Sequence, residues 1–410
     1  MHGSTDAFSR RALVQARRVL LFLLLWGAPL RAEPPAWFHL RPEVSAEWTA
    51  VADVARGDRV RLHHVQDPSL GGQSILVLFT KSSSAYDIAL SKLLSVFEDK
   101  RMRAVFTLQL LDEAQETRPP AGPLPFEPER YALIFTMGSD ATTYAFHHLR
   151  HLSVPIVSVC AKDPLLLLGI PASDFEAVRP ANMAFTSLDL PAEAHLVYLR
   201  ELLGELETLV LLYDRHNTSA VRTQVEPMRR VAAAQHVRVL EVGVERSEQA
   251  REELERALPE VLAQLGRERT GPGGQVFWVT GSTAVFQEID VIQRLARDVP
   301  VVSVAAEVVR PGDASAVMSI GVGFESNAHL AALYGVELLL GGVKPNALKV
   351  GVVSPPDIAI NFRKARRIGL SIPFGFLEAA SSVYGYDGQL VRKQGQDLKA
   401  PAGTPSGAAH

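Results

Sequence analysis

The feature that most constrains the fold is an internal repeat. Residues 133–163 read LIFTMGSDATTYAFHHLRHLSVPIVSVCAKD, and residues 276–308 read VFWVTGSTAVFQEIDVIQRLARDVPVVSVAAEV. Each copy is an apolar strand ending in Gly-Ser, a helix-length segment, and a second strand led by Val-Pro; the prolines, Pro155 and Pro300, lie 145 residues apart. Fully apolar strands separated by helices are typical of parallel sheets covered on both faces. The repeat therefore predicts an α/β chain with two similar Rossmann-like lobes, each built on a parallel sheet.

Strand and helix patterns outside the repeat set the expected boundaries. An apolar run at 74–80, a helical pattern at 86–99 and an apolar run at 104–111 open the first lobe. The run at 316–323 is interpreted as a strand that returns across a hinge. We expect lobe 1 over 73–185 and about 318–352, lobe 2 over 186–317 and about 353–385, an irregular extension over 33–72, and a disordered tail over 386–410.

The N-terminus has the pattern of an export signal. Four arginines precede a twelve-residue apolar stretch at 19–30, and Ala32 offers a small residue before a cleavage point. The stretch is shorter than the roughly 20 residues that span a bilayer. We expect cleavage near Ala32, with an uncleaved anchor as the alternative, and SRRALVQ at 9–15 leaves Sec and twin-arginine export both open. No cysteine follows the cleavage point, so no lipid anchor is expected.

Charge and cysteine content exclude some functions. Removing residues 1–32 takes away five arginines and Asp6, which moves the formal net charge from −3 to −7. Nucleic-acid binding proteins usually carry a basic footprint, so we expect no nucleic-acid partner. Cys160 is the single cysteine in the sequence, so no intramolecular disulfide can form.

The candidate ligand site follows from the topology. In open α/β sheets, ligands bind beyond the carboxyl ends of the strands, and the residues there are rich in hydroxyl groups. Several of these side chains have a simpler alternative role as helix caps or turn residues, notably Ser83, Asp163 and Asn217. Asp163 and Glu307 are either an amine-binding pair or two surface acids. The candidate ligand-binding residues are Ser82, Ser83, Ser84, Tyr86, Ser139, Asp140, Ala141, Asp163, Asp214, Asn217, Ser282, Thr283 and Glu307.

No catalytic or metal-binding pattern stands out. The chain contains no G-x-S-x-G elbow, no P-loop and no H-E-x-x-H. His147 and His151 lie one helical turn apart beside His148, but no acid or cysteine completes a tetrahedral ligand set. We therefore expect no enzyme activity, no cofactor and no metal.

Four blocks carry a resemblance to a known family. Residues 154–169, 181–220, 312–348 and above all 356–381, PDIAINFRKARRIGLSIPFGFLEAAS, resemble the exported substrate-binding proteins of ABC importers. In the last block we interpret the basic residues, Lys364 among them, as the solvated side of a helix that ends at Gly369. The chain differs from the family in its forty extra residues before the first strand, in a Pro-rich stretch at 118–130, and at Ile320, where an aromatic residue is usual.

The resemblance implies a type I periplasmic-binding-protein fold with a ligand cleft between two hinged lobes. It further implies a periplasmic, monomeric protein that closes on a small polar or amino-acid-like metabolite and delivers it to an ABC permease. The alternative is a ligand sensor of the cell envelope that uses the same fold without transport.

Overall fold

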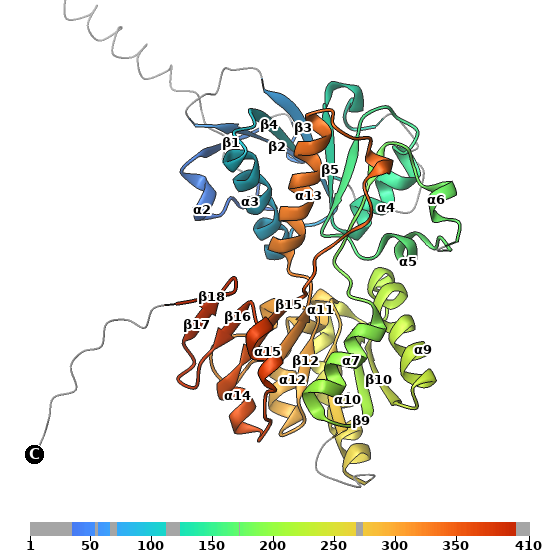
Figure 1. The fold of residues 1–410 in the computed structure, drawn as a ribbon, viewed down its shortest axis with the longest axis vertical. Helices are drawn as coiled ribbons and strands as arrows, with labels where there is room; N and C mark the ends of the chain where they lie inside the picture. The colour runs from blue at the N-terminus through green and yellow to red at the C-terminus, as the bar shows by residue number, and fades with distance from the viewer. Residues whose placement is uncertain are drawn as a thin grey trace, which may run out of the picture.

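The chain folds into two α/β lobes arranged along the long axis of the molecule (Figure 1). The computed structural model describes residues 35–53, 56–65, 72–111, 124–171, 173–267 and 274–398. The expected export signal at 1–32 lies outside these residues, as does part of the Pro-rich stretch.

Lobe 1 is built on a sheet of seven described strands in the order β1-β2-β4-β3-β5-β6-β7. Strands β3 to β7 run parallel to their neighbours, whereas β2 pairs antiparallel with both β1 and β4. The strands span β1 Trp48–Ala52, β2 Arg59–His64, β3 Gln73–Phe79, β4 Ala104–Leu110, β5 Leu133–Met137, β6 Ile156–Val159 and β7 Met183–Ala184.

The segment before β3 departs from the expectation. Residues 33–72 were expected to be irregular, but their described part contains the short helix α2 (Pro42–Ser45) and the strands β1 and β2. Trp48, Val60 and Leu62 point into the core of lobe 1. The extension is therefore the antiparallel edge of the lobe 1 sheet.

Helices cover both faces of this sheet. On one face α3 (Ser84–Asp99) and α13 (Phe324–Leu339) pack over the inward side chains of β3 and β4, such as Val77 and Phe106. On the other face α4 (Ser139–His148) packs over Leu76 and Ile134. Two short helices, α5 (Pro164–Leu168) and α6 (Phe175–Val178), follow β6. Successive side chains of β3 point to opposite faces of the sheet, and helices bury both faces. The strand is therefore apolar at consecutive positions.

Lobe 2 is built on a sheet in the order β10-β9-β11-β12-β13-β15-β16-β17-β18. Its first five strands are parallel, β15 is antiparallel to β13, and β17 and β18 form an antiparallel hairpin. The strands span β9 Leu206–Asp214, β10 Arg238–Val244, β11 Gly274–Val279, β12 Val301–Ser303, β13 Met318–Gly321, β15 Asp357–Asn361, β16 Ser382–Tyr384, β17 Leu390–Lys393 and β18 Gln396–Asp397.

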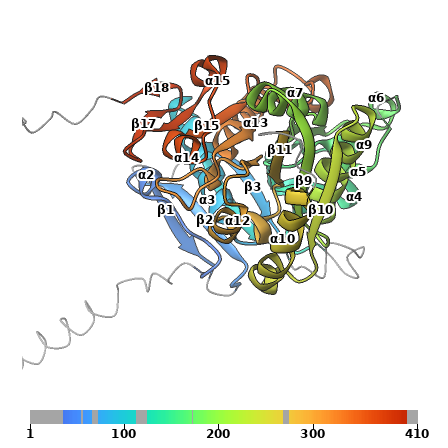
Figure 2. The same ribbon diagram turned by 90° about the horizontal axis from the view of Figure 1, so that it is seen from below.

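Two groups of helices sandwich the lobe 2 sheet; Figure 2 shows α7 and α10 on opposite sides of β9 and β10. One face carries α7 (Ala192–Leu203), α9 (Glu226–Ala234), α14 (Phe362–Arg367) and α15 (Phe374–Ala379). The other carries α10 (Ala250–Arg267), α11 (Thr283–Phe286) and α12 (Ile289–Ala296). The short α8 (Thr218–Ala220) and the π-helical turn η3 (Val221–Val225) lead into α9.

Two expectations for the C-terminal region are corrected. The tail was expected to be disordered from residue 386, but the chain continues through β17 and β18 to residue 397. Lys364 was expected on the solvated side of its helix, yet it is buried with 4% of its surface exposed. Gly369 does follow α14 with a positive φ of 68°, a conformation that glycine adopts readily.

Within its described residues, the chain crosses between the lobes three times. The first crossing runs from β7 through β8 (Thr186–Ser187) to α7, the second from β13 to α13, and the third from β14 (Gly351–Val352) to β15. Strands β8 and β14 pair in parallel, so two of the crossings lie side by side. Strand β13 belongs to the lobe 2 sheet, so the second crossing follows Gly321 and lobe 1 does not resume at 318 as expected.

Candidate ligand-binding site

A polar cavity of about 790 Å³ lies between the lobes at the carboxyl ends of several parallel strands. Both lobes contribute to its wall, through loops that follow β3, β5 and β9. This interlobe cavity, called the cleft below, is lined by Thr80, Lys81, Ser82, Ser83, Asp140, Thr143 and Leu167 of lobe 1 and by Asp214, His216, Asn217, Thr218, Ser219, Arg222, Ser247, Thr283 and Ala284 of lobe 2.

Several predicted site residues also act as helix caps. The Ser83 hydroxyl accepts a hydrogen bond from the Ala85 N–H (3.3 Å), and Asp163 Oδ1 accepts one from the Leu166 N–H (3.0 Å). Asn217 Oδ1 accepts from the Ala220 N–H at 3.0 Å. Capping of this kind satisfies N–H groups that the first turn of a helix leaves unpaired.

The two acids that line the cleft already have partners. Asp140 pairs with Lys81, with 3.0 Å between Oδ2 and Nζ. Asp214 is buried; its Oδ1 accepts a hydrogen bond from the His216 N–H (2.9 Å), and its Oδ2 accepts one from the Ser247 hydroxyl (2.8 Å). These contacts fix the polar loops after β3, β5 and β9.

The structure gathers about half of the predicted residues in the cleft. Ser82, Ser83, Asp140, Asp214, Asn217 and Thr283 line it, whereas Ser84, Tyr86, Ser139, Ala141, Asp163, Ser282 and Glu307 do not. Ser139 and Ser282 are buried behind it: the Ser139 hydroxyl accepts from the Lys162 N–H (3.1 Å) and the Ser282 hydroxyl from that of Thr280 (3.0 Å).

Tyr86 has a packing role beside the cleft. Its phenol lies over Gly138, where a Cβ would come within 2.0 Å of the hydroxyl oxygen. Gly138 also has a φ of 91°. Both facts require glycine at the end of β5, and they account for the Gly-Ser pair in the first copy of the repeat.

Glu307 lies in a different cavity, on the side of the second and third crossings. This space of about 780 Å³ is lined among others by Gly323, Phe324 and Asp357, and Asp163 does not line it. Asp163 lines neither this cavity nor the cleft. Burial raises the pKa of Glu307, and the nearby Asp357 adds to that rise.

Three buried residues that the sequence reasoning missed connect the lobes. Asp189, in the first crossing, accepts hydrogen bonds from the Asp163 N–H of lobe 1 (2.9 Å) and from Gln224 Nε2 of lobe 2 (2.8 Å). Gln224 Oε1 in turn accepts from the Gly281 N–H (2.8 Å). Lys162 lies beside this chain of hydrogen bonds; burial lowers its pKa, while Asp189 and Asp140 act in the opposite direction.

Only Lys162 had a sequence signal, because it directly precedes the candidate residue Asp163 at the end of an apolar strand. Gln224 stands in the middle of a helical pattern, and nothing in the sequence marks its side chain as a contact between the lobes.

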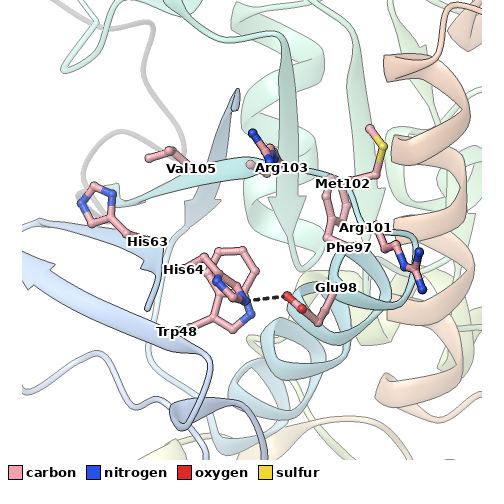
Figure 3. Close-up of a pocket in the computed structure, with 10 residues that line it drawn as sticks. Trp48, His63, His64, Phe97, Glu98, Arg101, Met102, Arg103 and Val105 are labelled. Carbon is pink, nitrogen blue, oxygen red and sulfur yellow. Dashed lines mark ion pairs between the residues drawn. The ribbon is translucent and has the colours of Figure 1, made fainter. Parts of the chain in front are cut away.

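A separate hollow of about 330 Å³ lies on lobe 1, away from the cleft (Figure 3). Its wall comes from β1, β2, the end of α3 and the start of β4, and none of the predicted site residues lines it. Figure 3 shows His64 facing Glu98, with 3.0 Å between Nε2 and Oε2. This contact links β2 to the end of α3, beside the buried side chains that pack the edge strands onto lobe 1.

The described part of the chain contains no cluster of three His, Cys, Asp or Glu side chains arranged to hold a metal ion. Nor does any helix within it combine the length and hydrophobicity needed to span a bilayer.

Known proteins resemble this chain in structure rather than in sequence. No family model matches the chain, and no curated protein matches it in sequence. A conserved domain protein from Vibrio cholerae superposes with a TM-score of 0.57 at 18% identity, covering 76% of this chain and 100% of that one. An ABC domain from Streptococcus pneumonia in complex with L-Trp gives 0.54 at 15% identity, covering 76% and 100% of the two chains.

A third structure is a ligand-free, open substrate-binding protein with adhesive properties from Clostridium difficile. It gives a TM-score of 0.52 at 15% identity, and the match covers 73% of this chain and 96% of that one. Two hinged α/β lobes, three crossings and these neighbours together define the class. The chain has the type I periplasmic-binding-protein fold.

Proposed function

We propose that this protein is an exported solute-binding component of an ABC import system. It binds a small polar metabolite in the cleft, closes by hinge motion, and delivers the ligand to a membrane permease. The observation that carries the proposal is the cleft itself, because residues of both lobes line one polar cavity between them.

A cleft of this kind couples binding to closure. A ligand that contacts Asp140 and Thr143 on one side and Thr218 and Thr283 on the other makes its full set of contacts only when the lobes are close. Its binding energy then favours the closed state, which is the condition for a ligand-driven population shift. The protein acts as a periplasmic monomer and catalyses no reaction; the export pattern before Ala32 supports this location.

The test of this proposal measures both ligand binding and the accompanying change in the dimensions of the protein. The purified protein is heated with a broad panel of metabolites, and each compound that raises the melting temperature is then tested by small-angle X-ray scattering. We expect at least one compound to raise the melting temperature and to reduce the radius of gyration. A panel that produces neither change argues against a solute-binding role.

The proposed role in transport is tested by identifying the membrane protein to which this chain binds. Once a ligand is known, cross-linking in envelope membranes with and without it should recover a permease of the ABC class. Recovery of a signalling protein in place of a permease would support the sensor alternative.

A further inference from the structure

A buried lysine points from lobe 1 toward lobe 2 beside the cleft. Lys162 follows β6, and the hydrogen bond from its N–H to the Ser139 hydroxyl (3.1 Å) holds its backbone against the start of α4. Its side chain crosses to Gly281 of lobe 2, where a Cβ would lie 3.0 Å from Nζ. Only 8% of Lys162 is exposed. The ammonium group of Lys162 therefore lies directly against the backbone of lobe 2 at Gly281.

This ammonium group has no direct partner. Among the described residues, Nζ of Lys162 takes part in none of the hydrogen bonds or ion pairs of the structure. The acids that act on it electrostatically are Asp189 and Asp140, and both are otherwise bonded. Asp189 accepts from the Asp163 N–H and from Gln224, and Asp140 pairs with Lys81. Because only a small part of Lys162 is exposed, little water reaches the ammonium group, and a nearby negative group would stabilise its charge.

The other charged groups around the cleft also differ by sign, because the acids have partners and a cation does not. Asp214 accepts two hydrogen bonds and Asp163 caps α5. Arg222, by contrast, lines the cleft and forms no hydrogen bond or ion pair with any described residue. Two cations near the cleft, Lys162 behind its lining and Arg222 in its wall, therefore form no ion pair with a described residue. Each nearby carboxylate, by contrast, takes part in at least one hydrogen bond or ion pair.

We propose that the ligand is a small organic acid without an ammonium group, and that its carboxylate pairs with Nζ of Lys162. The inference rests on the proposed solute-binding function and narrows its ligand class. Opening of the hinge separates Lys162 from Gly281 and admits the acid, and closure then surrounds the ion pair with Gln224 and Ser139. Arg222 at the cleft wall supplies a second positive charge for a diacid.

Matched probes test the ligand class on the unmodified protein. Calorimetric titration compares pyruvate with L-alanine and pyruvamide, and succinate with succinamide. We expect the acid of at least one set to bind at least about thirtyfold more tightly than its counterparts. The amides lack the negative charge, and L-alanine carries an additional positive charge. Equal or tighter binding of the amides or of L-alanine overturns the inference.

Substitutions test whether Lys162 binds the carboxylate of the ligand. Lys162→Met keeps the length of the side chain and removes the charge, and we expect it to lose about thirtyfold or more in affinity for the acid. Because it removes an unpartnered buried charge, it should unfold at no lower temperature than wild type. The matched control is Lys364→Met, which replaces the other lysine buried in the described structure. It lies in lobe 2 away from the cleft and should leave acid binding unchanged.

The outcomes separate the two proposals. Retained acid binding by Lys162→Met, or tight binding of a neutral or zwitterionic metabolite, overturns this inference and leaves solute binding standing. If neither these probes nor the broad panel binds, solute binding fails and this inference fails with it. Should Lys162→Met not fold, the acid-to-amide comparison on the unmodified protein decides alone.

Discussion

Gln224 of lobe 2 donates a hydrogen bond to Asp189 of the first crossing, with 2.8 Å between Nε2 and Oδ1. Since Asp189 also accepts from the Asp163 N–H of lobe 1, one carboxylate connects both lobes. Gln224 further accepts from the Gly281 N–H, next to the ammonium group of Lys162. The relative position of the lobes therefore depends on a buried amide as well as on the three crossings.

Replacing this amide should loosen the contact between the lobes. Gln224→Leu leaves a carboxylate oxygen of Asp189 and the Gly281 N–H without partners, so we expect a loss of about 1–3 kcal/mol in the free energy of unfolding. Urea unfolding measures the loss, and small-angle scattering should give a larger radius of gyration for the ligand-free variant. Gln287→Leu, at an exposed position in the same lobe, is the control. A variant with wild-type stability and dimensions would mean that the amide does not hold the lobes.

Asn327 supports the hinge from the side of lobe 1. It is fully buried on α13; its Oδ1 accepts from the Cys160 N–H (2.8 Å) and the Thr186 hydroxyl (2.9 Å), and its Nδ2 donates to the Ser187 carbonyl (3.0 Å). Asn327→Leu would leave these groups unsatisfied, and we expect it to cost about 2–4 kcal/mol in urea unfolding. Asn346→Leu, at an exposed site, should be close to neutral. Equal effects of the two changes would contradict the role assigned to Asn327.

The sequence identified the parallel cores of both lobes because their strands are buried on both faces. The runs at β6 and β12 carry no polar face, and such runs occur mainly in covered parallel sheets. The edge strands were missed for the opposite reason. β1 and β17 are short and only partly buried, so neither carries the continuous apolar run that marks the central strands. That β13 pairs within lobe 2 depends on distant partners, which a local pattern does not contain.

From the sequence, only the loops that surround the cleft could be predicted, and not the contacts of their side chains. Topology places the ends of β3, β5 and β9 together, which is why Ser82, Asp140 and Asp214 were found. Which charges are satisfied is a matter of side-chain geometry. Lys162 and Arg222 acquire their importance from the absence of partners among the described residues, and no spacing rule reveals that. The sequence therefore indicated the position of the cleft better than it indicated which charged groups around the cleft lack partners.

Gly335 sets how closely α13 packs on the lobe 1 sheet. A Cβ there would lie 2.4 Å from the Phe135 ring and 2.9 Å from a methyl group of Leu133, both on β5. Gly335→Ala should therefore force α13 outward and cost about 1–3 kcal/mol, measured by urea unfolding. Gly266→Ala is a control within a helix, because nothing lies within 4 Å of its Cβ position. It should be neutral or stabilising by up to about 1 kcal/mol, and a matching gain at Gly335 would contradict the close packing.

The pH dependence of stability should depend on His195. This residue of α7 is 4% exposed, and its ring lies edge-on to Trp278 with 5.3 Å between centroids. Burial lowers the pKa of His195 from 6.5 to about 4, and the nearby Asp189 opposes that fall only in part. The folded state thus binds this proton less readily than the unfolded state does. The contribution of His195 to the stability of the folded state is therefore complete above pH 6.5 and is lost as the pH falls from 6.5 toward 4.

We therefore expect the stability difference between wild type and His195→Leu to change across this window. Wild type should lose up to roughly 3 kcal/mol relative to the variant on going from pH 7.5 to pH 4. Urea unfolding of both proteins at each pH measures this difference, and titrations that the two proteins share cancel in the comparison. A difference that stays constant over the window would show that the imidazole is protonated as readily in the folded chain as in the unfolded one. In that case the acid sensitivity of the protein would have to come from carboxylates whose pKa is lowered on folding, such as Glu241 beside Arg229. Glu307 acts in the opposite direction, because its raised pKa favours the folded state at low pH.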